Sequence, residues 1–133
     1  DVVFDVDYQG GRDLKAKWPD ESLMIFILPP DWNTLEDRLR RRATDADDVI
    51  RRRLNKALDE LEYHKEYKHR VVNEEIEPAY AGLRAIYRVR KLGIEHSSVS
   101  KGDRELFESS QGESPYQHAE TLIADAKASR AQD

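Results

Sequence analysis

The sequence contains no cysteine, which excludes disulfide bonds, zinc sites built from cysteine and catalysis by a thiol. This composition fits a reducing compartment, and we expect the cytoplasm. No hydrophobic run approaches the length that spans a membrane, and no signal-peptide pattern opens the chain. The net charge of −5 argues against general affinity for nucleic acid. At 133 residues, the chain is long enough for one domain with a hydrophobic core.

Arginine, by contrast, is abundant in one stretch, residues 38–57. Two arginine clusters flank a short acidic run, and apolar residues at helical spacing accompany them: Arg38, Arg40, Arg41, Arg42, Arg51, Arg52 and Arg53, with Val49, Ile50, Leu54, Ala57, Leu58 and Leu61. The apolar spacing predicts an amphipathic helix, which we expect to begin near Thr44 and Asp45 because acidic residues favour the positive end of a helix. Guanidinium groups bind phosphate oxygens in pairs. The stretch therefore predicts either a cationic clamp for a polyanionic phosphate or a solvated helix face.

Two carboxylates fall near the end of a strand-like run at the start of the chain. Residues 2–7, VVFDVD, are rich in β-branched and aromatic residues and predict a short buried strand. Asp5 and Asp7 are two apart, so they share one face of that strand. In open α/β sheets the ligand crevice lies at the carboxyl ends of the strands. The two aspartates are therefore candidates for contact with a ligand or metal, and capping of the following turn is the alternative.

Further strands and helices alternate as far as residue 93. We predict strands over residues 23–28 and 69–72. We predict helices from Arg12 to Trp18, from a cap at Asn33 or Thr34 to about Arg42, over residues 45–66, and from Ala79 to Lys91 with Leu83, Ile86 and Tyr87 inward and Gly93 as the C-cap. The unbroken apolarity of residues 23–28 is typical of a strand buried on both faces. This alternation predicts an α/β fold with parallel strands.

The sequence beyond about residue 94 is polar and lacks an apolar period. We predict a flexible tail there. Ser114 and Pro115 can open a helix to about Ala131, with Leu122 and Ile123 as its few apolar contacts. Such a helix is marginal alone. The chain is thus divided into residues 1–92 and a polar tail of residues 93–133.

Four motifs in a fixed order resemble the second half of guanylate kinase. They are FDVDYQGG, IFILPP, RLRRRATDADDVIRRRL and EYKHRVVNEE, and the resemblance covers roughly residues 2–92. It implies a P-loop NTPase-type parallel sheet with flanking helices, present here as a partial domain with a helical lid at about residues 36–55. It also implies a nucleoside-monophosphate kinase that transfers the γ-phosphoryl group of ATP to GMP, giving ADP and GDP.

The resemblance assigns roles to three of the arginines. The family's lid carries arginines matching Arg38, Arg42 and Arg53, which reach the phosphates and adenine of ATP. Arg42 and Arg53 are the candidates for stabilising charge in the transition state, because phosphoryl transfer depends on positioning and charge neutralisation. The other arginines of the stretch are expected to be solvated surface.

The resemblance also assigns three polar side chains outside the lid. Asp5 matches an acidic residue near Mg²⁺, which accompanies ATP and would be held through a bound water. Asp7 matches a residue near the guanine of GMP. Asn73 matches a residue near the adenine edge, although an Asx-turn that closes the preceding strand is an alternative role.

Some parts of the family pattern are missing from this sequence. No G-x-x-x-x-G-K-[ST] motif occurs, and the GMP-binding segment that precedes FDVD in the family is absent. Because the chain begins at Asp1 without methionine, we expect it to be a piece of a longer protein. In the resembled sheet the P-loop strand lies between residues 2–7 and 23–28, so unpaired strand edges would remain. We therefore expect the isolated chain to be inactive and poorly folded without the missing N-terminal half.

Two other functions compete with the kinase assignment. One is a catalytically dead guanylate-kinase-like module that binds partner peptides, but such a module has no need of the arginines. The other is a related kinase that acts on a phosphorylated ribose. The expected partners are ATP, GMP and the missing half of the domain, without nucleic acid or membrane, and a homo-oligomer stays open. The four histidines show no metal-ligand spacing and are interpreted as incidental.

Overall fold

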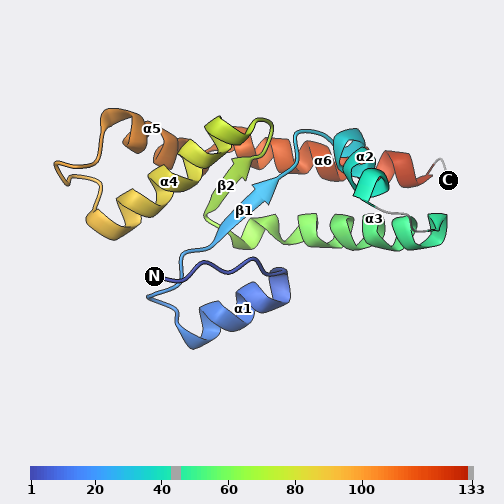
Figure 1. The fold of residues 1–133 in the computed structure, drawn as a ribbon, viewed down its shortest axis with the longest axis horizontal. Coiled ribbons are helices and arrows are strands. Elements are labelled where there is room, and N and C mark those ends of the chain that lie inside the picture. Colours follow the sequence, from blue (N-terminus) through green and yellow to red (C-terminus); the bar gives the residue numbers. More distant parts are fainter. Residues whose placement is uncertain (43–45, 132–133) are drawn as a thin grey trace.

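A computed structural model of the chain describes residues 1–42 and 46–131. Its elements in order are α1 (Tyr8–Lys17), β1 (Ile25–Leu28), α2 (Trp32–Arg42), α3 (Asp47–Glu62), the 3₁₀ helix η1 (Tyr63–Glu66), β2 (His69–Val72), α4 (Ile76–Leu92), α5 (Lys101–Ser110) and α6 (Glu113–Ala131). The two strands pair in parallel, with Ile25 opposite His69 and Leu28 opposite Val72. The backbone N–H of Asn73 donates to the carbonyl of Leu28 at 2.7 Å and continues this pairing past β2. Helices surround the small sheet (Figure 1).

The predicted alternation of helices with parallel strands is confirmed for residues 8–92. β1 and β2 fall within the two predicted strands. Helix α4 ends at Leu92 with Gly93 as its C-cap; the φ of Gly93 is 96°, in the left-handed region, and its N–H donates to the Val89 carbonyl. The cap of α2 was predicted wrongly. The carboxylate of Asp31 accepts the N–H of Thr34 at 2.6 Å, so Asp31 caps this helix rather than Asn33 or Thr34.

The predicted helix over residues 45–66 is α3 followed by one 3₁₀ turn. Thr44 and Asp45, expected at its start, lie outside the described residues, and Ala46 precedes α3 without a side-chain cap. In α4, Ile86 is buried as predicted. Tyr87 was predicted to face inward and is 45% exposed instead.

The strand predicted over residues 2–7 is absent. This segment is extended but unpaired, and its apolar side chains are exposed, with Val3 95% exposed. A strand requires a hydrogen-bonding neighbour, and the sheet of the described residues consists of β1 and β2 alone. Asp7, at the end of the segment, caps α1 by accepting the N–H of Gly10 at 2.9 Å. The alternative of capping the next turn is therefore realised at Asp7.

The polar segment predicted to be flexible contains α5. Ser100 and Asp103 form a reciprocal capping box, with the Asp103 N–H donating to the Ser100 hydroxyl at 3.0 Å. One face of α5 meets the sheet, where Phe107 lies against the ring of His69, with centroids 5.0 Å apart. The prediction of a flexible segment is wrong because a cap and a few buried contacts hold this helix against its neighbours.

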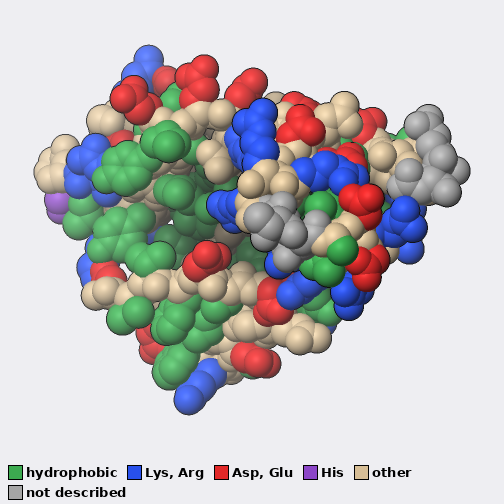
Figure 2. Space-filling view, turned by 45° about the vertical axis from the view of Figure 1, so that its right-hand side comes forward, with side chains coloured by type: hydrophobic (Ala, Val, Ile, Leu, Met, Phe, Trp, Pro, Cys, Tyr) green, Lys and Arg blue, Asp and Glu red, His purple; other side chains and the backbone are tan. Residues whose placement is uncertain are grey.

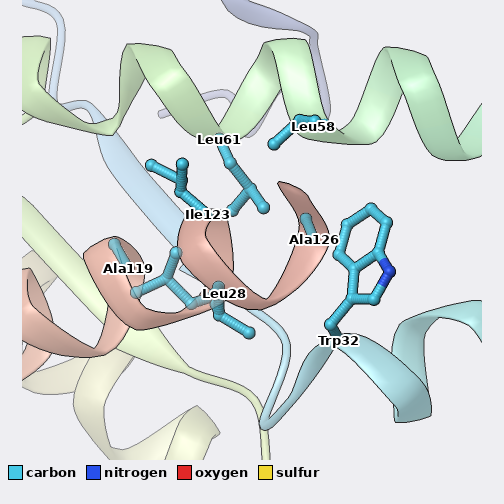
Figure 3. Close-up of a cluster of buried hydrophobic side chains, with 8 residues drawn as sticks. Leu28, Trp32, Leu58, Leu61, Ala119, Ile123 and Ala126 are labelled. Carbon is cyan, nitrogen blue, oxygen red and sulfur yellow. The ribbon is translucent and has the colours of Figure 1, made fainter. Parts of the chain in front are cut away.

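The main core lies between α6, α3 and the start of α2. Its buried members are Leu28, Trp32, Leu58, Leu61, Ala119, Leu122, Ile123 and Ala126 (Figure 3). The helix predicted to open at Ser114 is confirmed as α6. Its side chains contribute half of that list, so α6 is an integral layer of the fold rather than an appendage.

Candidate functional site

The arginine-rich stretch forms the two neighbouring helices α2 and α3. Leu54, Leu58 and Leu61 face the core from α3, and Leu35 packs on the same core from α2. With a period of 3.6 residues, the opposite faces turn to solvent. All seven arginines of the stretch are therefore exposed: Arg38, Arg40, Arg41, Arg42, Arg51, Arg52 and Arg53. The structure thus presents two adjacent cationic helix faces.

Some of these arginines form ion pairs with acidic side chains of α2 and α3. Arg40 contacts Glu36 at 2.9 Å and Asp47 at 3.5 Å, so it links α2 to the start of α3. Arg52 contacts Asp48 at 3.8 Å, one turn away on α3. Exposed pairs of this kind contribute little to stability, about 0–1 kcal/mol. Their chief effect here is to neutralise part of the positive surface.

The two candidate aspartates precede α1 in the chain. Asp5 is exposed in the extended N-terminal segment. Asp7 uses one carboxylate oxygen to cap α1, so its position is fixed by the helix it begins. The start of α1 is also fastened to α3, because the Tyr8 N–H donates to a carboxylate oxygen of Glu60 at 3.1 Å.

Asn73 follows β2 directly and is partly buried. It lines a mostly apolar hollow of about 170 Å³ together with Ile27, Val71, Ile76, Ala79, Tyr80 and Leu83. Ile27 is 51% exposed, Ile76 is 82% exposed and Tyr80 is 64% exposed. Figure 2 shows hydrophobic side chains gathered around a hollow on one half of the face, with basic and acidic side chains mixed on the other half.

A second hollow of about 150 Å³ lies at the opposite end of the strands. It is lined by residues of α1, of the segments before β1 and β2, and of α4, among them Arg12, Lys15, Glu66, Lys68 and Arg90. Of the candidate site residues Arg38, Arg42, Arg53, Asp5, Asp7 and Asn73, Asn73 alone lines either of these two hollows. The candidate arginines, aspartates and asparagine thus stand on separate elements: the arginines on α2 and α3, Asp5 and Asp7 before α1, and Asn73 after β2.

Sequence reasoning missed a buried polar cluster around His64. Arg70 donates from Nε to Nδ1 of His64 at 2.9 Å and from its terminal nitrogen to the His64 carbonyl at 2.8 Å. The other ring nitrogen, Nε2, therefore carries the proton of the neutral imidazole, and it lies 3.7 Å from a carboxylate oxygen of Glu120. The ring of Tyr116 in α6 packs against both His64 and Arg70, and its centroid lies 4.8 Å from the guanidinium of Arg70.

Burial of the imidazole lowers the pKa of His64, and the charge of Arg70 lowers it further. His64 is 0% exposed, so no substrate reaches it, and its role is to hold β2, η1 and α6 together. The signal in the sequence was Arg70 inside the apolar strand HRVV, because a buried arginine requires acceptors. His69 is likewise buried and bonds to the hydroxyl of Ser110 at 2.8 Å.

The described residues contain no group of three histidine, aspartate or glutamate side chains placed to hold a metal ion. A single exposed carboxylate such as Asp5 does fit Mg²⁺ that keeps most of its waters and is bound chiefly by nucleotide phosphates. Within the same part of the chain, no helix is both long and apolar enough to cross a membrane.

Comparison with known proteins identifies one family. Its sequence model, described as guanylate kinase, matches residues 1–89. The chain is 41% identical over 92 residues to the guanylate kinase of Chelativorans sp. (strain BNC1), which covers 69% of this chain and 42% of that protein. It is 44% identical over 92 residues to the guanylate kinase of Rhodopseudomonas palustris (strain BisB18), with the same coverage. The guanylate kinase of Gluconobacter oxydans is 39% identical over 92 residues, 69% of this chain and 44% of its own. The chain thus spans less than half the length of these relatives.

Proposed function

Because this chain belongs to the guanylate kinase family, we propose that it supplies the lid-bearing half of an enzyme that transfers the γ-phosphoryl group of ATP to GMP. The products are ADP and GDP. The observation that carries this proposal is the family match itself, which spans the arginine-bearing helices α2 and α3 as well as the parallel strands. Residues 1–92 form the family part, and residues 93–133 are a C-terminal extension.

The arginines bind and neutralise the transferred phosphate. Arg38, Arg42 and Arg53 contact ATP, and Arg42 and Arg53 stabilise the charge that develops as the phosphoryl group moves between nucleotides. Their exposure on two adjacent helices supports this role, because an exposed guanidinium can reach a ligand. An arginine that acts in this way contributes about three to five powers of ten in rate.

The remaining contacts come from the segment before α1 and from the end of β2. Asp5 would hold, through a bound water, the Mg²⁺ that accompanies ATP, and that ion would supply neutralisation of the phosphate charge. Asp7 accepts from the N–H groups of guanine while its other oxygen caps α1. Asn73, beside the last pair of the parallel sheet, contacts the adenine edge of ATP.

The missing N-terminal half of the domain completes the sheet. β1 pairs with β2 along one edge, and next to it Ile27, Ile76 and Tyr80 leave an apolar surface in solvent. Exposed apolar patches of this kind mark surfaces that are covered by a partner. We therefore expect the chain alone to be inactive, because the loop that cradles the phosphates belongs to that half.

The decisive experiment restores the missing half. We define a fusion protein in which an N-terminal segment of the Chelativorans guanylate kinase is placed directly before Asp1. This segment is the part of that enzyme that precedes the match to the chain. A coupled assay for ADP should detect turnover with ATP and GMP, and much less with AMP, UMP or ribose bisphosphate. The chain without this half should be inactive. Turnover by the chain alone, or preference for ribose bisphosphate, would contradict the proposal, and peptide binding without turnover would favour the scaffold function.

Neighbouring arginines supply a matched pair of variants. Arg42→Met in the fusion protein should lower kcat by about 1,000-fold or more, because charge stabilisation in the transition state is lost. Arg41→Met removes an equal charge from the same exposed turn and should change kcat less than about threefold. An exposed charge that does not contact the phosphate is screened by salt. Equal effects of the two substitutions would show that general charge, rather than a specific phosphate contact, is responsible.

A further inference from the structure

Helix α6 lies wholly outside the family match and yet contacts both arginine-bearing helices. The match ends at residue 89, and α6 spans Glu113–Ala131. This helix packs on α3, on η1, on β2 and on the start of α2. In Figure 1, α6 runs alongside α3, and α2 lies close to both of them. A segment predicted to be a marginal helix therefore forms the base of the helix pair.

The buried face of α6 has the spacing of one helical stripe. Its members follow the pattern i, i+3, i+4, i+7: Ala119, Leu122, Ile123 and Ala126. The two alanines of this stripe allow the helix to lie close to its neighbours. Ala126, 1% exposed, lies beside the indole of Trp32, the first residue of α2 (Figure 3). Leu58 and Leu61 approach the same cluster from the last turns of α3.

Polar contacts fix α6 at both ends of this stripe. Near its start, Nε2 of His118 lies 2.8 Å from the carbonyl oxygen of Pro29, in the loop between β1 and α2. Toward its end, Lys127 forms an ion pair with Glu62 of α3 at 3.2 Å. The two contacts are nine residues apart, which is about 14 Å along the helix. Such a span holds the direction of α6 as well as its position.

We propose that α6 is a brace that positions the arginines of α2 and α3 for the bound nucleotide. The positioning residues are Trp32, at the start of α2, and Ala126 of α6, which packs against it. Arg42 follows Trp32 by ten residues, so a tilt of about 5° at the base displaces it by about 1 Å over a lever of about 15 Å. A displacement of that size costs about 100-fold in rate where a group must be aligned. This inference rests on the proposed phosphoryl transfer for its catalytic part and on the packing alone for its mechanical part.

Hydrogen exchange on the fusion protein tests the mechanical part, since the chain alone is expected to fold poorly. Ala126→Gln places a larger polar side chain against Trp32. The matched control, Ala124→Gln, makes the same change at an exposed position of the same helix. We expect amides of α2 and of the last turns of α3 to exchange about tenfold faster in Ala126→Gln, while β2 and α4 are unchanged. Equal exchange in both variants would overturn the brace, and so would a lack of protection in α6 of the parent fusion protein.

Kinetics in the fusion protein test the catalytic part. Ala126→Gln should lower kcat and raise the KM for ATP about tenfold while the KM for GMP holds. A loss of folded protein alone would lower kcat and leave both KM values unchanged, which would contradict positioning. If Ala126→Gln does not fold, Ile123→Val removes one methyl group from the same core cluster, which is a milder change. It should shift the KM for ATP in the same direction. Absence of GMP turnover in the parent fusion protein would refute the proposed function and leave hydrogen exchange to decide the brace.

Discussion

The buried pair of Arg70 and His64 gives a prediction whose size follows from its contacts. Arg70 is 6% exposed and donates twice to His64, once to the ring and once to the carbonyl. The substitution Arg70→Met keeps most of the apolar stem and removes the guanidinium. Both acceptors of His64 then remain buried without these donors. The helix α6 also loses a contact, because the ring of Tyr116 covers the guanidinium.

The expected loss combines opposing contributions. A hydrogen bond from a charged donor is worth about 1.5–3 kcal/mol, and each acceptor left buried costs about 1–3 kcal/mol. The cation–π contact adds about 0.5–2 kcal/mol. Removal of a buried charge recovers part of this sum, because the guanidinium no longer has to be desolvated. We therefore expect Arg70→Met to lower the free energy of unfolding by about 2–4 kcal/mol.

Urea unfolding of the fusion protein, followed by far-UV dichroism, measures this loss. The double substitution Arg70→Met with His64→Leu is the sharper comparison, since it removes the buried imidazole as well as its donor. Replacing both partners by apolar groups can be nearly neutral, so the double variant should be more stable than Arg70→Met alone. Lys101→Met, an exposed cation at the start of α5, serves as the control. If the double variant is no more stable than Arg70→Met alone, the reasoning about unsatisfied acceptors is wrong.

Three further predictions concern pH, a cap and a core contact. Burial lowers the pKa of both His64 and His69 in the folded protein, so the fold favours their neutral forms. The free energy of unfolding should therefore be highest above about pH 6.5 and should fall below it, by at most about 2.7 kcal/mol per pH unit for two protons. Urea titrations at pH 7.5 and 5.5 measure this difference. Asp7→Ala should cost about 1 kcal/mol and Asp7→Asn much less, because asparagine also caps a helix. If Asp7 binds guanine, Asp7→Asn should still raise the KM for GMP in the fusion protein. Leu122→Ala should cost about 2–5 kcal/mol in the same unfolding assay, whereas Thr121→Ala, exposed on the same helix, should cost little.

The sequence predicts the parts of this fold that depend on local pattern. The apolar run at residues 23–28 contains β1, the strand predicted over residues 69–72 is β2, and the period of Leu54, Leu58 and Leu61 becomes the inner face of α3. Gly93 ends α4 because a left-handed residue is easiest for glycine. These features need no knowledge of distant partners, so they could be read from a few neighbouring residues.

The C-terminal helices were harder to predict because their buried contacts are small or polar. In α6 the apolar stripe consists half of alanine, which is common on exposed faces as well, and only Leu122 and Ile123 stood out. In α5 the useful signal was Ser100 followed three residues later by Asp103, a capping box. The candidate site shares this difficulty, since exposure alone does not separate Arg42 from Arg41, and the distinction comes from the family resemblance.

The N-terminal segment shows how a locally correct pattern can lack its partner. Residues 2–7 have the composition of a buried strand, yet Val3 stands in solvent and Ile27 of β1 is half exposed. Both observations have one cause, because a strand buried between two others needs hydrogen bonds and apolar contacts on both sides. The matched part is 42% of the length of these relatives, and we expect the neighbour that these residues suit to lie in the part that the match does not cover. We therefore expect one contact with that part to cover both the exposed apolar surface and the unpaired segment.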